Sequence, residues 1–560
     1  MNSRNYKTAA LVLGLFTFLI CGCTARPSNA VSSSPATSSY KLSIRLAPEI
    51  PRLDVSGTIQ LPPADVSRHD IELSLSELMN DFHVEVVSPS TSSGAVKLEQ
   101  TDRPQSRSGW GVVTWKIIPA QPFPANEPIV LRFSYARETE GASFIFDLAK
   151  EVTFAGGVGT AWYPQLEDLA ADKAGPFKGQ RSTGVLEFAV PSGYMVHANG
   201  VQQQTAAGVF RFEVNQPSFF SFGAARYMVK KSDGPIHTAL YALRSRASEA
   251  QFLDGTARIL KVLADEFGDY PFSEFAIVEV PTQQSSRAGF DGASMDSFIF
   301  VNSDYLDKGF NTAFFGHEIS HQWWGNVIIS KSVDGRWMLS EGMAQFGSLR
   351  AVEVLEGETA AAEYRRTGYP GYIPDQCARG YFKLVSKGQD HPLLNLSANN
   401  NQSRVLADSK GAIVWDMLAR TLGRDVFNRI LRKVISENKY QRVAWQQFVN
   451  ALEAGSGQDL KWFVTQWIEQ TGAPDYKLTW KQEGQTLQGT VSQTAPYFRA
   501  DLEIEVQESG GGFVKVVQIS GAQASFNWTL PFRAESVTLD PYYRVLRWTP
   551  EFRAEVSAAH

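Results

Sequence analysis

The spacing of apolar residues changes twice along this 560-residue chain, and that change limits the folds open to it. From Tyr40 to about Met228, apolar and polar residues alternate in short segments broken by glycine and proline, which is typical of β-strands. From about Gly234 to Gly472 the period lengthens to that of amphipathic helices. After Pro474 the alternation returns over about seventy residues, as expected for a small β-sandwich.

We therefore expect a multidomain α+β protein, because a chain of this length is too long for one hydrophobic core. The expected parts are a signal peptide, a flexible tether, an N-terminal β domain, a mainly helical domain, a C-terminal β-sandwich and a short tail. Their predicted limits, in the same order, are 1–22, 23–39, 40–233, 234–474, 475–551 and 552–560. The formal net charge is −5 and no basic residues cluster, which argues against nucleic acid as a partner.

The N-terminal segment has the pattern of a secretory signal. Arg4 and Lys7 precede the apolar run AALVLGLFTFLI, which is too short to span a bilayer comfortably. Residues 24–39 are rich in serine, alanine and proline and lack periodicity, as a flexible tether does. The protein is therefore expected to be exported.

The stretch ICGC at residues 20–23 is similar to a bacterial lipobox, which implies cleavage behind Gly22 and a lipid anchor on Cys23. Thr24, in place of aspartate, follows this cysteine and by the same resemblance favours the outer membrane of the cell envelope. The alternative is an ordinary signal peptide cleaved a few residues later. Cys377 has no disulfide partner in either case and is expected to be a buried, small apolar residue.

The segment GHEISHQWWGN at residues 316–326 is the candidate for chemistry. On a helix, His317 and His321 lie on one face, where both imidazoles can reach one metal ion, and Glu318 lies about 100° round the helix. Asn311 is a suitable cap for the start of that helix. The alternative is two packed histidines on an ordinary core helix. Five other histidines occur singly and are expected at the surface or in hydrogen bonds: His69, His83, His197, His237 and His391.

A metal site of this kind needs a third protein ligand. Downstream, GRWMLSEGMAQFGSLRAVEVLEG is typical of a second helix, with Ser340 as its expected N-cap and Glu341 in its first turn. A lone carboxylate there can be simply a favourable charge on the helix dipole. Opposite two histidines, it completes a His-His-Glu set.

HEISHQWWGN followed by WMLSEGMAQF resembles the gluzincin zinc aminopeptidases, the family of membrane alanyl aminopeptidase and leukotriene hydrolase. Other stretches resemble further parts of that family: TAWYPQLED, FGDYPFSEFAIVEVP, SKGAIVWDMLARTLG and DLKWFVTQWIEQTGAPDY. The likeness covers most of residues 40–550 in the same domain order. It implies a thermolysin-like zinc peptidase domain at residues 234–474 and peptides as substrates.

By this resemblance, His317, His321 and Glu341 bind one zinc ion per chain, and Glu318 is the general base. The family has one residue fewer between the second histidine and the third ligand than the nineteen that separate His321 from Glu341. The strict spacing falls on Ser340, which is a poor zinc ligand, so Glu341 is the predicted one. The extra residue is expected in a loop just before the helix.

The resemblance also implies residues that contact the substrate. GFDGASMDSFIF matches the family's substrate-binding strand through Gly292 and Ala293, with Asp296 in place of the glutamate that holds the substrate's α-amine and Ser297 in place of the next asparagine. Aspartate keeps the charge but withdraws it by roughly 1 Å, a misplacement that can cost on the order of a hundredfold. Asp291 is a possible substitute.

A tyrosine of the family that donates to the oxyanion is replaced here by Asp408, in VLADSKGAIVW. An ionised carboxylate cannot stabilise an oxyanion, and the loss of one such donor typically costs about 10²–10³ in turnover. Tyr372 and Tyr381 are candidates to replace it.

The expected activity is therefore that of an exported, lipid-anchored zinc aminopeptidase that removes N-terminal residues from peptides. Asp296 and Ser297 suggest one alternative, a zinc metallopeptidase without a strict requirement for a free amine. Asp408 suggests another, a catalytically weakened lipoprotein that binds zinc and peptides.

Overall fold

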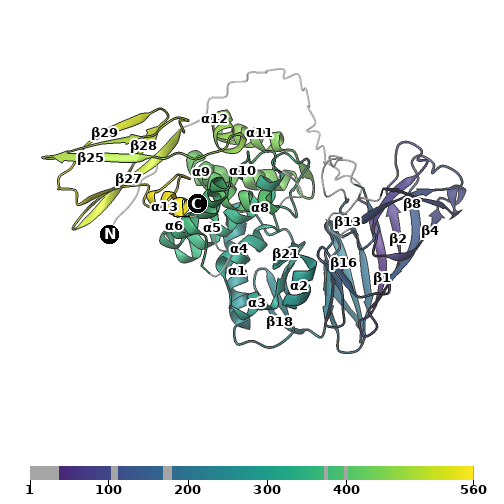
Figure 1. Ribbon diagram of the computed structural model, residues 1–560. Helices are drawn as coiled ribbons and strands as arrows, with labels where there is room; N and C mark the ends of the chain where they lie inside the picture. The colour runs from purple at the N-terminus through teal and green to yellow at the C-terminus, as the bar shows by residue number, and fades with distance from the viewer. Residues whose placement is uncertain (1–36, 103–110, 168–178, 371–375, 397–400, 559–560) are drawn as a thin grey trace, which may run out of the picture. The chain divides into compact units, whose positions relative to one another are not determined.

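The computed structural model describes residues 37–102, 111–167, 179–370, 376–396 and 401–558 (Figure 1). The predicted signal peptide, Cys23 and nearly all of the predicted tether lie outside these residues. In the described part of the chain, no helix combines the length and the apolar character needed to cross a membrane.

The N-terminal part contains a large sheet whose strands arise from the alternation of apolar and polar residues. The eight strands lie in the order β15 (Val201–Ala206), β16 (Val209–Ser218), β13 (Ser182–Ala189), β1 (Ser39–Ala47), β2 (Arg52–Leu61), β8 (Ile129–Arg137), β4 (Asn80–Ser88) and β5 (Gly94–Ala95). In β1, the alternate side chains of Tyr40, Leu42, Ile44 and Leu46 are buried. These side chains form one face of the hydrophobic core of the N-terminal part.

Two smaller sheets complete the N-terminal part. The first has the order β14 (Met195–Ala198), β17 (Phe222–Ala225), β11 (Val152–Ala155), β10 (Phe146–Leu148) and β9 (Gly141–Ser143). The second has the order β12 (Gln165–Leu166), β3 (Ile71–Ser76), β7 (Val112–Ile118) and β6 (Lys97–Asp102), and a single 3₁₀ turn, η1 (Ser90–Ser92), follows β4.

The middle part begins with a mixed sheet that carries one edge of the site described below. Its order is β18 (Met228–Ser232), β19 (His237–Ala242), β20 (Glu274–Val280), β22 (Phe298–Asn302) and β21 (Gly292–Met295). β20 runs parallel to both of its neighbours, and the edge strand β21 is antiparallel to β22. β20 is almost wholly buried, as its largely apolar sequence EFAIVEV predicts.

The rest of the middle part is mainly helical. Its helices are α1 (Glu249–Phe267), α2 (Thr282–Ala288), α3 (Ser303–Asp307), α4 (Thr312–Ser320), α5 (Met343–Glu356), α6 (Glu358–Thr367), α7 (Cys377–Ser386), α8 (Asn401–Leu406), α9 (Ala412–Leu422), α10 (Arg424–Glu437), α11 (Trp445–Ser456) and α12 (Lys461–Val464). Wide π-helical turns are present at η2 (Met338–Gly342), η3 (Ala407–Gly411) and η4 (Thr465–Glu469), and two short strands, β23 (Ile329–Ser330) and β24 (Arg442–Val443), pair in parallel. The apolar stripe of α5, Met343, Phe346, Leu349 and Val352, is buried, and α5 packs against α4.

The C-terminal part consists of two three-stranded sheets and a final helix. One sheet has the order β25 (Lys477–Glu483), β26 (Thr486–Ser492) and β29 (Gln523–Thr529), and the other has the order β28 (Gly511–Ile519), β27 (Ala500–Glu508) and β30 (Ser536–Leu539). Where a tail is expected, Pro550–Ala558 forms helix α13, and its Phe552 ring lies 5.2 Å from that of Phe382. The predicted fold class, β domain, helical domain and C-terminal β-sheets, is confirmed.

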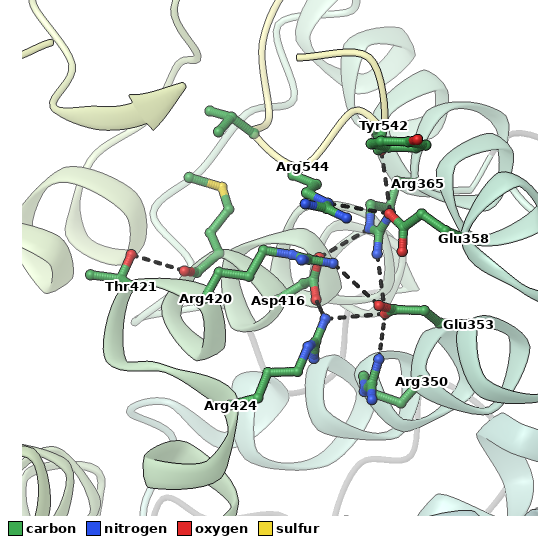
Figure 2. Close-up of polar contacts among 12 residues, drawn as sticks. Arg350, Glu353, Glu358, Arg365, Asp416, Arg420, Thr421, Arg424, Tyr542 and Arg544 are labelled. Atoms are coloured by element: carbon green, nitrogen blue, oxygen red, sulfur yellow. Dashed lines mark hydrogen bonds and ion pairs between the residues drawn. The ribbon is translucent and has the colours of Figure 1, made fainter. Parts of the chain in front are cut away.

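A cluster of arginines surrounds the buried side chain of Asp416 on α9 (Figure 2). The Asp416 carboxylate accepts hydrogen bonds from Arg365 Nε at 3.0 Å, Arg420 Nε at 3.2 Å and Arg424 Nη2 at 2.6 Å. Burial acts to raise the pKa of Asp416, but these three guanidinium groups hold it well below its usual range. The buried charge is therefore fully compensated.

Arg365 extends this cluster toward the C-terminal part. Its Nη1 donates to Glu358 Oε1 at 2.8 Å and to the carbonyl oxygen of Tyr542 at 3.3 Å. Arg544 Nε donates to the same Glu358 oxygen at 3.2 Å. The cluster thus joins helices α6, α9 and α10 to the chain between β30 and α13.

His197 on β14 is a buried histidine in an aromatic environment. Its ring is 1% exposed and lies 4.7 Å from the ring of Tyr241 and 4.9 Å from that of Phe298, between centroids. Neither ring nitrogen has a hydrogen-bond partner among the described residues. Burial, with a smaller effect of Lys231, lowers the pKa of His197 to about 3. The expectation of a surface or hydrogen-bonded histidine is therefore wrong at this position.

His197 should make the protein sensitive to mild acid. Its pKa is about 3 in the folded protein and about 6.5 when unfolded, so between these values only the unfolded chain binds the proton. Stability is therefore unaffected above pH 6.5 and is lost as the pH falls below it, by about 2 kcal/mol at pH 5. Thermal unfolding at pH 7.5 and pH 5 should show a smaller acid-induced loss for His197→Phe than for wild type. The exposed His237→Phe is the control, and an unchanged acid response in His197→Phe would contradict this account.

Candidate metal centre

Helix α4 presents the two histidines of the GHEISHQWWGN segment. Its predicted cap is confirmed, because the Asn311 side chain accepts a hydrogen bond from Phe314 N at 2.9 Å. Every residue of α4 is buried, including His317 and Glu318. The regular helix ends at Ser320, and His321 occupies its C-cap.

His317, His321 and Glu341 meet in one place. The two Nε2 atoms are 3.1 Å apart, Glu341 Oε2 lies 3.4 Å from His317 Nε2, and Glu341 Oε1 lies 3.8 Å from His321 Nε2. One ligand atom from each of the three residues falls within 4.8 Å of the others. The predicted His-His-Glu set is therefore spatially together.

The Nδ1 atoms of His317 and His321 act as hydrogen-bond donors within the protein. His317 Nδ1 lies 2.7 Å from Gln345 Oε1, and His321 Nδ1 lies 2.9 Å from the carbonyl oxygen of Trp324. Since both partners are acceptors, each Nδ1 carries the proton, and both Nε2 lone pairs point toward each other and toward Glu341. A cation resolves that arrangement of three facing acceptors, so the donor set fits a zinc ion.

The pKa values of the site's residues also fit a centre that binds a cation. Burial acts to lower the pKa of His317, but the hydrogen bond that protonated His317 donates to Glu341, together with the nearby carboxylates, outweighs it and raises the value to about 9. Burial acts to raise the pKa of Glu341, but the two histidines hold it well below its usual range. The centre therefore attracts positive charge, either protons or a metal ion.

Glu341 lies in the π-helical turn η2, which continues directly into α5. Two sequence-based expectations are corrected here. The additional residue is held by a wide helical turn and not by a loop, and Ser340 is not an N-cap, because its Oγ donates to the carbonyl of Arg336 one turn earlier at 3.0 Å. A π turn inserts one residue into a helix and is frequent at functional sites.

Glu318 lies beside strand β21. Burial is the main cause that raises the pKa of Glu318 to about 7, close to neutral pH, where a general base is most effective. A Cβ atom at Gly292 would lie 2.6 Å from Glu318 Oε1, so the strand can come this close only because residue 292 is glycine. Gly292 and the buried Ala293 thus form the wall of the site next to Glu318.

Asp296 points away from solvent, into the contact with the N-terminal part. Its carboxylate forms a buried ion pair with Arg181, and Oδ2 also accepts a hydrogen bond from Phe219 N at 3.1 Å. Ser297 is buried too, with a backbone φ of +71°, and donates its N–H to Gln322 Oε1 at 2.9 Å. The role of Asp296 in holding an α-amine stays a prediction, and its Oδ2 is already engaged within the protein. Asp291 is exposed and accepts from Asn302 Nδ2 at 2.9 Å.

Asp408 lies in the second π turn, η3, which packs against η2. Burial and the neighbouring Glu341 raise the pKa of Asp408 to about 7. Of the two candidate tyrosines, Tyr372 lies outside the described residues. Tyr381 is buried and donates its hydroxyl to Asp390 Oδ2 at 2.7 Å.

The whole of this geometry lies within one recognisable unit. Residues 252–467 match the model of the peptidase family M1 domain. This stretch is therefore similar to the M1 domain. It includes His317, Glu318, His321, Glu341 and Asp408, whereas Arg181 belongs to the N-terminal part.

Relatives of the M1 domain are aminopeptidases. Aminopeptidase N of Lactococcus lactis subsp. lactis is 24% identical over 275 residues, which are 46% of this chain and 30% of that protein. Aminopeptidase M1 of Arabidopsis thaliana is 25% identical over 261 residues, 43% of this chain and 28% of that protein. The chain thus matches less than a third of the length of these two relatives.

The fold extends the likeness beyond the M1 domain. The crystal structure of Legionella pneumophila aminopeptidase A in complex with aspartic acid superimposes with a TM-score of 0.65 at 13% sequence identity. The superposition covers 92% of this chain and 60% of that one. At this identity the shared property is the fold.

Several residues that shape the centre were not among those predicted from sequence. Gln345 holds His317 and is itself fixed, since its Nε2 donates to Tyr364 Oη at 2.7 Å and to Gln376 Oε1 at 3.1 Å. Its place four residues after Glu341, on the same helical face, is a signal that could have indicated it. The contact of His321 with Trp324 could not have been predicted in this way, because it is made by a backbone carbonyl and not by a side chain.

The identity of the third ligand can be tested through metal content. Glu341→Ala should lose most of the bound zinc, because only two ligands remain, while Ser340→Ala should keep one zinc per chain. Metal analysis of the purified variants after dialysis measures this directly. Zinc retained in Glu341→Ala and lost in Ser340→Ala would show that Ser340, and not Glu341, is the third ligand.

Proposed function

We propose that this protein is a zinc metallopeptidase of the aminopeptidase type, which releases N-terminal residues from peptides. The observation that carries the proposal is the convergence of His317, His321 and Glu341 beside Glu318, inside the stretch that is similar to the M1 domain. The aminopeptidase relatives support the substrate class, although each is matched over only part of its length.

Each group of residues has a separate role in the proposed reaction. His317, His321 and Glu341 would hold one zinc ion per chain, which when bound acts as a Lewis acid and lowers the pKa of water. Glu318, with a pKa of about 7, is suited to take a proton from the attacking water and to pass it to the leaving amine. The backbone of Gly292 and Ala293, on the edge strand β21 of the sheet, is positioned to pair with an extended peptide.

A second candidate is a zinc metallopeptidase that does not require a free N-terminal amine. The ion pair between Asp296 and Arg181 favours it, because an aspartate bound to an arginine is a poor partner for a substrate ammonium group. A third candidate is a weakened enzyme that binds zinc and peptides, motivated by Asp408 in place of a donor.

We also propose that the protein is exported to the bacterial cell envelope and lipid-anchored at Cys23, with the outer membrane as the favoured location. The support is the sequence of residues 1–23, in which basic residues precede an apolar run that ends in ICGC. Mass spectrometry of the mature N-terminus tests this, and an unmodified terminus downstream of Cys23 would contradict it.

Replacing the general base should separate metal binding from chemistry. Glu318→Gln is expected to keep its zinc and to lower turnover of a peptide substrate by about 10²–10⁴, since an amide cannot accept the proton. The matched control is Glu437→Gln, an exposed glutamate on α10. Full activity in Glu318→Gln with zinc bound would refute the mechanism, and a broad peptide library without any Glu318-dependent cleavage would favour the third candidate.

The requirement for a free amine has its own test. An aminopeptidase should cleave an unblocked peptide and reject its N-acetylated form, because the acetyl group removes the ammonium that the site must bind. Liquid chromatography of both digests by the wild-type protein measures the ratio of rates. Comparable rates for the two peptides would select the second candidate.

A further inference from the structure

Arg404 is a cation next to Asp408 that no role described so far uses. It lies on α8, and its Nη1 is 3.5 Å from Asp408 Oδ2. The side chain of Asp408 is 4% exposed and that of Arg404 is 39% exposed. Residues four apart share a helical face, so Arg404 emerges on the same side of the helix as Asp408, one turn earlier and nearer to solvent.

That side of the helix faces the metal centre. The turn η3 packs against η2, and a Cβ atom at Gly411 would lie 3.5 Å from Gly342 Cα, next to Glu341. Arg404 and Asp408 therefore lie on the helix face that packs against the turn that carries Glu341.

Peptide hydrolysis needs a group with the properties of Arg404 at this position. When water adds to the scissile carbonyl, the carbonyl oxygen gains negative charge, and a preorganised donor aimed at it lowers the barrier. Glu318, Glu341 and Asp408 are carboxyl groups, and the Nδ1–H groups of both histidines are already used. Arg404 offers a permanent positive charge and five N–H donors.

We propose that Arg404 donates to the scissile carbonyl oxygen and that Asp408 is the positioning residue that orients its guanidinium group. This inference rests on the proposed peptidase function. It gives Asp408 a role that a carboxylate can perform, because an acid that cannot stabilise an oxyanion can still anchor the cation that does. Oδ2 of Asp408 faces Arg404, while its Oδ1 is buried without a hydrogen-bond partner in the described part of the chain.

The first test compares binding of two ligands to the zinc-loaded protein. Calorimetry measures the affinity for a phosphinic tripeptide, which carries a negatively charged tetrahedral group. The affinity for the parent amide peptide is measured in the Glu318→Gln background, in which cleavage is slow. Arg404→Met should weaken the phosphinic ligand by about 10²-fold and the amide peptide much less, because only the former carries the charge. The control is Arg429→Met, an exposed arginine on α10, and zinc content should be equal in all variants.

Steady-state kinetics supply the second readout. Arg404→Met should lower kcat by about 10²–10³ with little change in KM, and added guanidinium ion should restore part of the activity of Arg404→Ala. Asp408→Asn should lower kcat less, and it should add little to Arg404→Met, since it acts through Arg404. Additive losses would contradict the positioning role.

Other outcomes overturn the proposal without touching the proposed function. Unchanged kcat and phosphinic affinity in Arg404→Met, or equal weakening of both ligands, would remove Arg404 from the chemistry. A loss confined to KM for peptides with a free C-terminal carboxylate would show instead that Arg404 binds the end of the substrate. If wild type cleaves no peptide at all, the proposed function fails, while the calorimetric comparison still tests Arg404.

Discussion

Buried negative charge is the constraint around which the centre of this molecule is organised. Glu318, Glu341 and Asp408 lie within a few side chains of one another, and transfer of a carboxylate from water into such surroundings costs several kcal/mol unless a cation or a proton compensates it. The structure shows both responses. Glu341 stays ionised against two histidines, whereas the pKa values of Glu318 and Asp408 rise to about 7. A centre so arranged has a strong preference for a cation, and the pKa values of Glu318 and Asp408 lie close to neutral pH.

The surrounding parts of the chain hold this centre from two sides. From the N-terminal part, Arg181 pairs with Asp296 and also donates to the carbonyl oxygen of Asn326, in the loop that follows His321. The same loop supplies the Trp324 carbonyl that orients the His321 ring. On the other side, the arginine cluster around Asp416 joins the helices behind α5 to the C-terminal part. The orientation of His321, a predicted metal ligand, thus depends on contacts between residues more than a hundred positions apart.

Local patterns in the sequence were sufficient where the controlling contacts are local. The helix that carries His317, its Asn311 cap, the second helix after it and the three-part fold all follow from spacing and were predicted. The partner of Asp296 was not, because Arg181 lies 115 residues earlier and only the packing of two domains brings it near. The environment of His197 was missed for the same reason, since its neighbours come from β19 and β22. Arg404 was overlooked because its charge has meaning only beside Asp408 and Glu341.

The π turn at Glu341 has a consequence for how such sites change over time. A wide turn absorbs one inserted residue inside a continuous helix, so the residues on either side keep their positions and no loop must be rebuilt. Gln345 can therefore continue to hold His317 even though the ligand has moved one place along the chain. Insertions that would break a stricter geometry can in this way persist as nearly silent changes. A search that demands a fixed interval between the second histidine and the glutamate will pass over chains of this kind, and one that allows a single-residue slip there will find them.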